Sequence, residues 1–241
     1  MALKTKAAPT GEFPGFTEEA FKFLKGLKKN NDREWFLPRK RIFETQLQEP
    51  MTALMLGVEA ELRRNQVLLL TKNKAILNRI YRDVRFSANK DPYHTHIGGM
   101  LHKNGRKDAP GGLYVHIGDK EKFAAVGFWQ PDRPLLTNWR VRMQEDPKAF
   151  LKMVQQLKSK DLVMDDKHRL QRMPRGFEAE EGSGIAEYLR YQSFVIIRPL
   201  DKAEVMSPQL PSIITKFGLD AKPLLEFGWA VPGARRTVFM D

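Results

Sequence analysis

The chain has 241 residues, 41% of them hydrophobic and 10% aromatic, a composition typical of a folded globular protein rather than a disordered one. Its 41 Lys and Arg residues exceed its 29 Asp and Glu residues by a formal net charge of +12, and it contains no cysteine. The missing cysteine excludes a disulfide framework, a thiolate nucleophile and a cysteine-based zinc site. No apolar run approaches the roughly 20 residues of a membrane span, and no signal peptide is visible, so we expect a cytoplasmic protein without a membrane partner.

The first third of the chain predicts three helices after a loose tail at residues 1–12. Thr17 is placed to cap the first helix, which has two glutamates in its first turn. Asp32 begins a second helix, and Pro50 opens a third, since proline suits the first helical turn. The third helix carries one apolar stripe at helical spacing, formed by Met51, Leu54, Met55, Val58 and Leu62.

The period of the hydrophobic pattern changes to two from about residue 66. Residues 75–87 and 93–102 predict two strands on either side of the turn-like sequence ANKDP. Gly118 and Asp119 predict a hairpin between two further strands. We expect those two strands at residues 113–117 and 122–129. A helical region is expected at 134–160, another strand at 193–200, and one helix or two short ones at 207–229.

This order of elements predicts a single α+β domain over residues 13–230, followed by a C-terminal tail at 231–241. We expect a central, mainly antiparallel sheet with N-terminal and C-terminal helices packed on it. The alternating strands and helices of a parallel sheet are not visible in the pattern.

The positive charge is concentrated between Arg63 and Lys107, where eleven Lys or Arg residues face only Asp83 and Asp91. Such a cluster attracts phosphates, nucleic acid or acidic surfaces, although a solvated basic face has the same composition. Its densest part is RIYRDVRFSANKDPYHTH at residues 79–96.

If residues 79–86 form an extended strand, alternate side chains share a face of the sheet. Arg82 then lies among apolar neighbours, where a guanidinium must either pair with a distant carboxylate or line a cavity. Asp83 lies on the opposite face between Arg79 and Arg85 and would orient one of them. The apolar neighbours of Arg82 in this arrangement are Ile80, Val84 and Phe86.

These residues predict a site for a small phosphorylated or carboxylated ligand, because guanidinium groups bind such anions in bidentate fashion. His96 or Asp83 would move a proton. The wall of the site could include the stretch NNDREWF at residues 30–36, which otherwise provides a helix cap and an anchoring Trp. The candidate ligand-binding residues are Arg79, Arg82, Arg85, Ser87, Lys90 and Tyr93.

A metal site is the weaker interpretation of the same stretch. His94 and His96 form a His-x-His fragment, but divalent metals normally also need carboxylates, and this region has few. Neither the serine elbow of hydrolases nor a Walker A or G-x-G-x-x-G loop occurs. We therefore expect no metal and no cofactor.

The stretches FLKGLKKNNDREWF, RIYRDVRFSANKDPYHTH, GGLYVHI with AAVGFWQP, RMPRGF and SFVIIRPL together resemble the family known as domain of unknown function 2461. The resemblance spans roughly residues 13–228 and implies a single α+β domain of undefined activity. One departure is Gln192, where the resemblance implies a lysine. The positions that match the central signature are Arg82, Asp83, Arg85, Phe86, Ser87, Lys90, Pro92, Tyr93 and His96.

Three functions remain open from the sequence. The first is binding of, and possible catalysis on, a small anionic ligand. The second is nucleic-acid binding through the same basic residues, with Tyr81, Phe86 and Tyr93 as stacking partners. The third is a structural module in which the arginines form only an ion-pair network. The sequence specifies neither the reaction nor the oligomeric state.

Overall fold

The structure is a computed structural model that describes residues 13–71, 77–106, 109–178 and 182–233. The predicted tails at 1–12 and, from residue 234 on, at the C-terminus lie outside these residues. Val231 is only 2% exposed and belongs to the hydrophobic core, so the packed structure reaches one residue beyond the predicted boundary.

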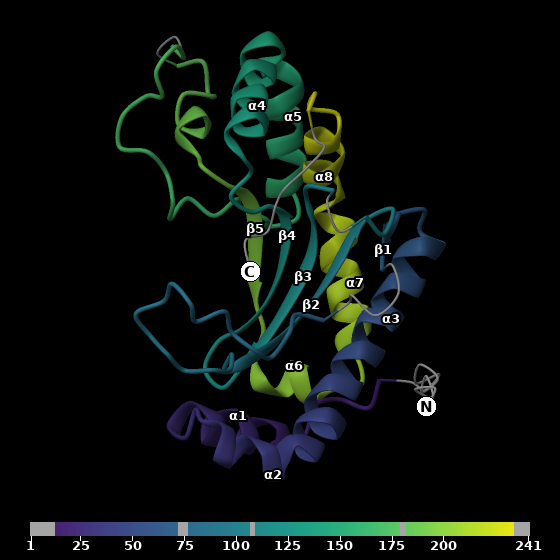
Figure 1. Ribbon diagram of the computed structural model, residues 1–241. Coiled ribbons are helices and arrows are strands. Elements are labelled where there is room, and N and C mark those ends of the chain that lie inside the picture. The colour runs from purple at the N-terminus through teal and green to yellow at the C-terminus, as the bar shows by residue number, and fades with distance from the viewer. Residues whose placement is uncertain (1–12, 72–76, 107–108, 179–181, 234–241) are drawn as a thin grey trace.

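A five-stranded antiparallel sheet forms the centre of the protein (Figure 1). Each strand pairs with its neighbour in the sequence, in the order β1-β2-β3-β4-β5, and this meander confirms the predicted α+β class. The hairpin predicted at Gly118 and Asp119 joins β3 to β4. The strands are β1 Leu69–Leu70, β2 His96–Lys103, β3 Gly112–Gly118, β4 Lys122–Phe128 and β5 Phe194–Pro199.

Helices cover one face of the sheet and both of its ends (Figure 1). α3 and α7 lie across one face, α1 and α2 lie beyond the end at which β2 begins, and α4, α5 and α8 gather at the other end. None of the helices in the described part of the chain is both long and apolar enough to cross a bilayer. The helices are α1 Glu18–Lys29, α2 Arg33–Phe43, α3 Glu49–Arg64, α4 Arg133–Glu145, α5 Pro147–Lys158, α6 Lys202–Met206, α7 Leu210–Asp220 and α8 Lys222–Trp229.

Local capping explains where these helices begin. The Thr17 side chain accepts a hydrogen bond from the backbone N–H of Ala20, and Asp32 accepts one from Trp35 at 2.7 Å, so both predicted caps are confirmed. The helical region predicted at 134–160 divides into α4 and α5 at Asp146, which caps α5. A π-helical turn at Glu44–Gln48 joins α2 to α3 without a break.

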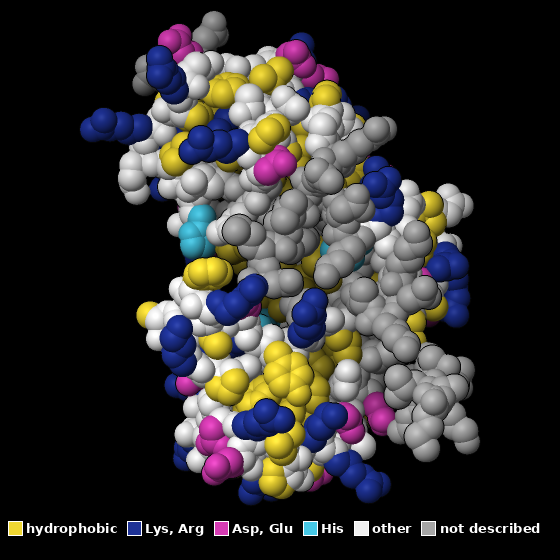
Figure 2. Space-filling view, viewed as in Figure 1, with side chains coloured by type: hydrophobic (Ala, Val, Ile, Leu, Met, Phe, Trp, Pro, Cys, Tyr) yellow, Lys and Arg dark blue, Asp and Glu magenta, His cyan; other side chains and the backbone are white. Residues whose placement is uncertain are grey.

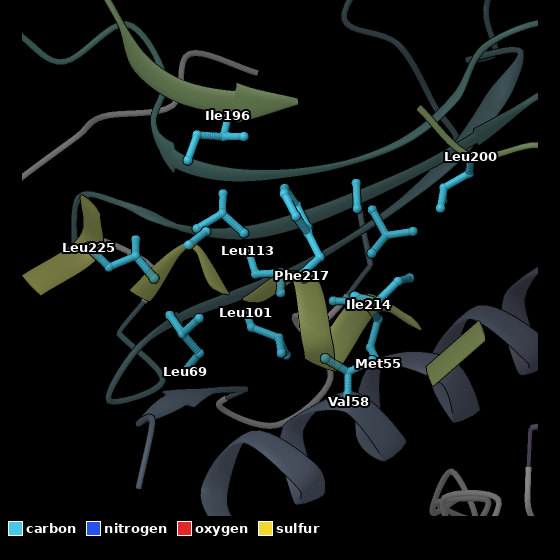
Figure 3. Close-up of a cluster of buried hydrophobic side chains, with 14 of the residues drawn as sticks. Met55, Val58, Leu69, Leu101, Leu113, Ile196, Leu200, Ile214, Phe217 and Leu225 are labelled. Carbon is cyan, nitrogen blue, oxygen red and sulfur yellow. The ribbon is translucent and has the colours of Figure 1, made fainter. Parts of the chain in front are cut away.

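One part of the core lies between the sheet and the α3–α7 layer (Figure 3), and the core continues to the helices at both ends of the sheet. The whole apolar stripe predicted for α3 is buried, and Met55 and Val58 point toward Leu101 of β2. Burial of each such side chain contributes about 1.5–3 kcal/mol. Gly99 lets α3 approach β2, because a Cβ atom there would lie 2.6 Å from Cγ of Met55.

The strand predicted at 75–87 does not form over residues 77–87, and residues 75 and 76 lie outside the described part of the chain. Residues 77–95 form an irregular segment (hereafter segment 77–95) with isolated bridges from Leu77 to Gly99 and from Tyr81 to Tyr93. Ile80 is buried, whereas Phe86, expected on the same face, is 96% exposed. The burial of side chains therefore does not follow the predicted alternation beyond the bridges.

Segment 77–95 is fastened to the N-terminal helices by a side-chain amide. Asn31, in the junction between α1 and α2, donates from Nδ2 to the backbone oxygen of Tyr93 at 2.9 Å. The backbone N–H of Tyr93 donates to Oδ1 of Asn31 at 3.0 Å. The Tyr93 ring also stacks on Phe36 of α2, with ring centroids 4.2 Å apart. One amide thus pairs with the Tyr93 backbone as a neighbouring strand would.

We predict that Asn31→Ala lowers the free energy of unfolding by about 1–3 kcal/mol, because it leaves two part-buried backbone groups of Tyr93 without partners. Urea denaturation measures this loss. Asn30→Ala is the matched control, since its amide donates only to the exposed backbone oxygen of Gly26. Equal losses in the two variants would contradict the role given to Asn31.

Candidate functional site

Segment 77–95, the α1–α2 junction and the first residue of β2 line an open hollow of about 170 Å³. Three predicted site residues, Arg82, Tyr93 and His96, line this hollow. The stretch NNDREWF contributes Asn31, as one of its two interpretations anticipated. The other lining residues are Asn89, Asp91, His94 and Thr95.

Arg82 is half-buried, and its Nη1 donates to the backbone oxygen of Asp91 at 3.0 Å. Among the described residues, no Asp or Glu forms an ion pair with it. Two arrangements are expected for this guanidinium: pairing with a distant carboxylate, or a place in a cavity wall. In the structure it lies in the wall of the hollow. The backbone positions Arg82 through its N–H, which donates to Pro92 at 2.9 Å.

Asp83 and Arg85 form a bidentate ion pair outside the hollow. Arg85 donates from Nη2 to Oδ2 of Asp83 at 2.6 Å and from Nε to Oδ1 at 3.0 Å. The hydrogen bonds from Arg85 lower the pKa of Asp83 to about 2, so Asp83 is a weak base at neutral pH. The Arg85 side chain is 77% exposed. Of the arginines in segment 77–95, Arg85 alone has a carboxylate partner among the described residues.

The remaining predicted residues also lie outside the hollow. Lys90 donates to the backbone oxygen of Val84 at 3.0 Å and so closes the turn of the segment. Arg79 is exposed, and Ser87 is half-buried without lining the hollow. Of the four cationic side chains of this segment, Arg82 is therefore the one that lines the hollow.

Two histidines, His96 and His116, stack on the face of the sheet that points away from α3, and the ring of His94, from segment 77–95, is tilted against His96. The rings of His94 and His96 are 5.1 Å apart, those of His96 and His116 are 4.1 Å apart, and His116 stacks on Phe123 of β4 at 4.8 Å. Oη of Tyr114 lies 3.2 Å from Nδ1 of His116. Sequence reasoning did not include His116 in the site, since only the register of β2 with β3 brings it next to His96.

Burial keeps these imidazoles neutral. It lowers the pKa of His96 to about 4, with further contributions from His116 and His94, and lowers the pKa of His116 to about 4. The pKa of His94 is lowered by burial and by the charge of Arg82. At pH 7 the histidines are hydrogen-bonding groups and proton acceptors. Arg82 then supplies the positive charge of the hollow, and Asp91 supplies a negative one.

A second hollow, of about 320 Å³, lies where β4 leads into α4. Gln192, the departure from the family pattern, lines it together with Arg133 and His168. None of the predicted site residues lies there. Within the described ranges, no group of three or more His, Asp or Glu side chains is arranged to hold a metal ion in either hollow.

Comparison with known proteins places most of the chain in one sequence family. Residues 19–227 match the family described as conserved hypothetical protein, DUF2461, and the match includes all of segment 77–95. Neither the curated proteins nor the solved structures contain a match to the chain.

The histidine stack predicts a loss of stability in acid. The folded pKa values of about 4 lie below the ordinary value of 6.5, so the unfolded chain takes up protons first as the pH falls. The free energy of unfolding is therefore expected to decline between about pH 6.5 and pH 4. His116→Phe retains a ring against Phe123 and removes one titrating group. Urea denaturation at pH 7 and pH 4.5 should show a smaller decline in this variant, and an unchanged decline would contradict the assignment.

Proposed function

The chain belongs to the DUF2461 family, and we propose that it binds a small ligand through a phosphate or carboxylate group in the hollow lined by Arg82. This proposal rests on the burial and the hydrogen bonding of the Arg82 side chain. Its half-buried guanidinium is hydrogen-bonded to a backbone oxygen and has no carboxylate partner in the described part of the chain. Because burying an unpaired charge is costly, an anionic group of a ligand would stabilise this arrangement.

The polar groups around Arg82 suit an anion. The Asn89 amide, the Thr95 hydroxyl and the neutral imidazoles of His94 and His96 can donate hydrogen bonds to its oxygens. His96 is the residue of the hollow that we propose to exchange a proton with the ligand, because its imidazole is neutral at pH 7. Asp83 is the other candidate for proton exchange. We assign it a structural role instead, because its ion pair with Arg85 keeps the Asp83 carboxylate ionised.

Sulfate tests the proposal, because its charge does not change near neutral pH. We predict that Arg82→Gln weakens sulfate binding about tenfold, the effect of losing a charge-assisted hydrogen bond. Binding to the native protein should strengthen as the pH falls from about 6 toward 4, because a bound anion favours protonated His96, whose pKa burial lowers to about 4. Isothermal titration calorimetry measures both effects.

Arg79→Gln is the matched control for this experiment. It removes the same charge from the same segment, but its side chain is exposed and lies outside the hollow. We expect sulfate binding close to that of the native protein. If both variants weaken sulfate binding equally, the anion responds to the net charge of the protein, and the Arg82 site is wrong.

A second candidate function, binding of single-stranded nucleic acid, is favoured by the exposure of Phe86. Phe86 is 96% exposed and Tyr81 is 56% exposed, and both project from a segment with exposed arginines. Tyr93, the third predicted stacking residue, is only 3% exposed and is stacked on Phe36. Lys and Arg side chains are scattered over the visible face in Figure 2 rather than gathered in one stripe, so the candidate rests on Phe86.

This candidate predicts that Phe86→Ala weakens binding of a short oligothymidylate by about fivefold or more, because one stacked base contributes about 1–3 kcal/mol. Fluorescence anisotropy at two salt concentrations measures the change. The fold should be unaffected, because the ring is exposed. Equal affinity of the native protein and the variant at both salt concentrations would exclude this role for Phe86.

A further inference from the structure

The hollow around Arg82 also carries a negative charge that nothing in its described surroundings neutralises. Asp91 lines the same hollow, and its carboxylate forms no ion pair with any cation of the described chain. Arg82 contacts the main chain of Asp91 instead, through the 3.0 Å hydrogen bond to its backbone oxygen. The two opposite charges therefore line one space without forming an ion pair with each other.

The backbone explains why these two side chains stay apart. The backbone N–H of Asp91 donates to Oδ1 of Asn89 at 2.8 Å, and its backbone oxygen accepts from Arg82. Both polar groups of the Asp91 main chain are thus fixed within the segment. Its carboxylate is exposed and remains able to receive a further cation.

The histidines do not neutralise this carboxylate. Burial keeps His96 neutral at pH 7, and His94 is shifted in the same direction by burial and by the charge of Arg82. A ligand that carries only negative charge would be attracted by Arg82 and repelled by Asp91. A ligand that carries only positive charge would be attracted by Asp91 and repelled by Arg82. A ligand with both charges has a partner for each.

We propose that the ligand of this hollow is a small zwitterion, with its phosphate or carboxylate on Arg82 and a primary ammonium group on Asp91. The ligand class is that of aminoalkyl phosphates and α-amino acids. The proposal rests on the proposed function for its anionic half and adds the role of Asp91. The volume of about 170 Å³ agrees with a short ligand, because typical small-molecule pockets begin at about 300 Å³.

Ethyl phosphate and O-phosphoethanolamine test this directly, because they differ only in the ammonium group. Attraction to a basic protein alone would favour ethyl phosphate, which carries the greater net negative charge. We expect the opposite order at pH 7.5, with O-phosphoethanolamine bound about two- to fivefold more tightly, the effect of one partly exposed ion pair. Isothermal titration calorimetry at constant ionic strength gives the ratio of the two dissociation constants.

Asp91→Asn should remove this preference. In this variant we expect ethyl phosphate to bind more tightly than to the native protein, and O-phosphoethanolamine to lose its advantage. Glu121→Gln is the control, because Glu121 is close enough to raise the pKa of His96 but does not line the hollow. That variant should retain the preference. Thermal unfolding checks that both variants are folded.

The outcomes separate this inference from the proposed function. If Arg82→Gln weakens both ligands but the native protein binds them equally or prefers ethyl phosphate, the zwitterion is wrong and the anion site stands. If Asp91→Asn leaves the preference intact, the assignment of the ammonium group to Asp91 is wrong. If neither ligand binds to the native protein, or Arg82→Gln changes neither affinity, both proposals fail.

Discussion

The two-way hydrogen bonding between the Asn31 amide and the Tyr93 backbone is the interaction on which the candidate site depends. It joins residues that are 62 positions apart in the sequence and holds segment 77–95 against the N-terminal helices. The caps Thr17 and Asp32 start the helices on either side of Asn31, and Phe36 supplies the ring on which Tyr93 stacks. Both bonded residues line the hollow, so the same contacts stabilise the fold and shape the site.

The charged residues of segment 77–95 differ in their pairing, according to whether they line the hollow. Outside the hollow, Asp83 and Arg85 satisfy each other in a bidentate pair. Inside it, Arg82 and Asp91 share one space without pairing, beside imidazoles that burial keeps neutral. We propose that Arg82 and Asp91 bind the ligand, because both line the hollow and neither forms an ion pair among the described residues. The density of charge in residues 79–96 therefore has two origins, a structural ion pair and a proposed site.

The sequence predicted the parts of the fold that depend on neighbouring residues. Helix caps, the apolar stripe of α3 and the β3–β4 hairpin are encoded within a few positions and were all confirmed. The strand at 75–87 was not confirmed, because alternation of side chains does not reveal how far two segments pair, and here the pairing is limited to isolated bridges at Leu77 and Tyr81. The stretch NNDREWF was a candidate wall of the site, but the pairing of Asn31 with Tyr93 is a long-range contact, and only strand register brings His116 next to His96, so residue spacing encodes neither contact. The sequence places Asp91 in a turn within the basic cluster, but it does not show that Asp91 and Arg82 line the same hollow.

The most direct test of the account is an NMR titration of the isotope-labelled protein with O-phosphoethanolamine, followed through backbone and Asn side-chain amide shifts. We expect changes at the Asn31 side chain and at the backbone amides of Arg82, Asp91 and His96, and the loss of the three backbone changes in the Asn31→Ala protein. Changes centred on Phe86 and the exposed outer face of the segment, or no changes at all, would contradict it.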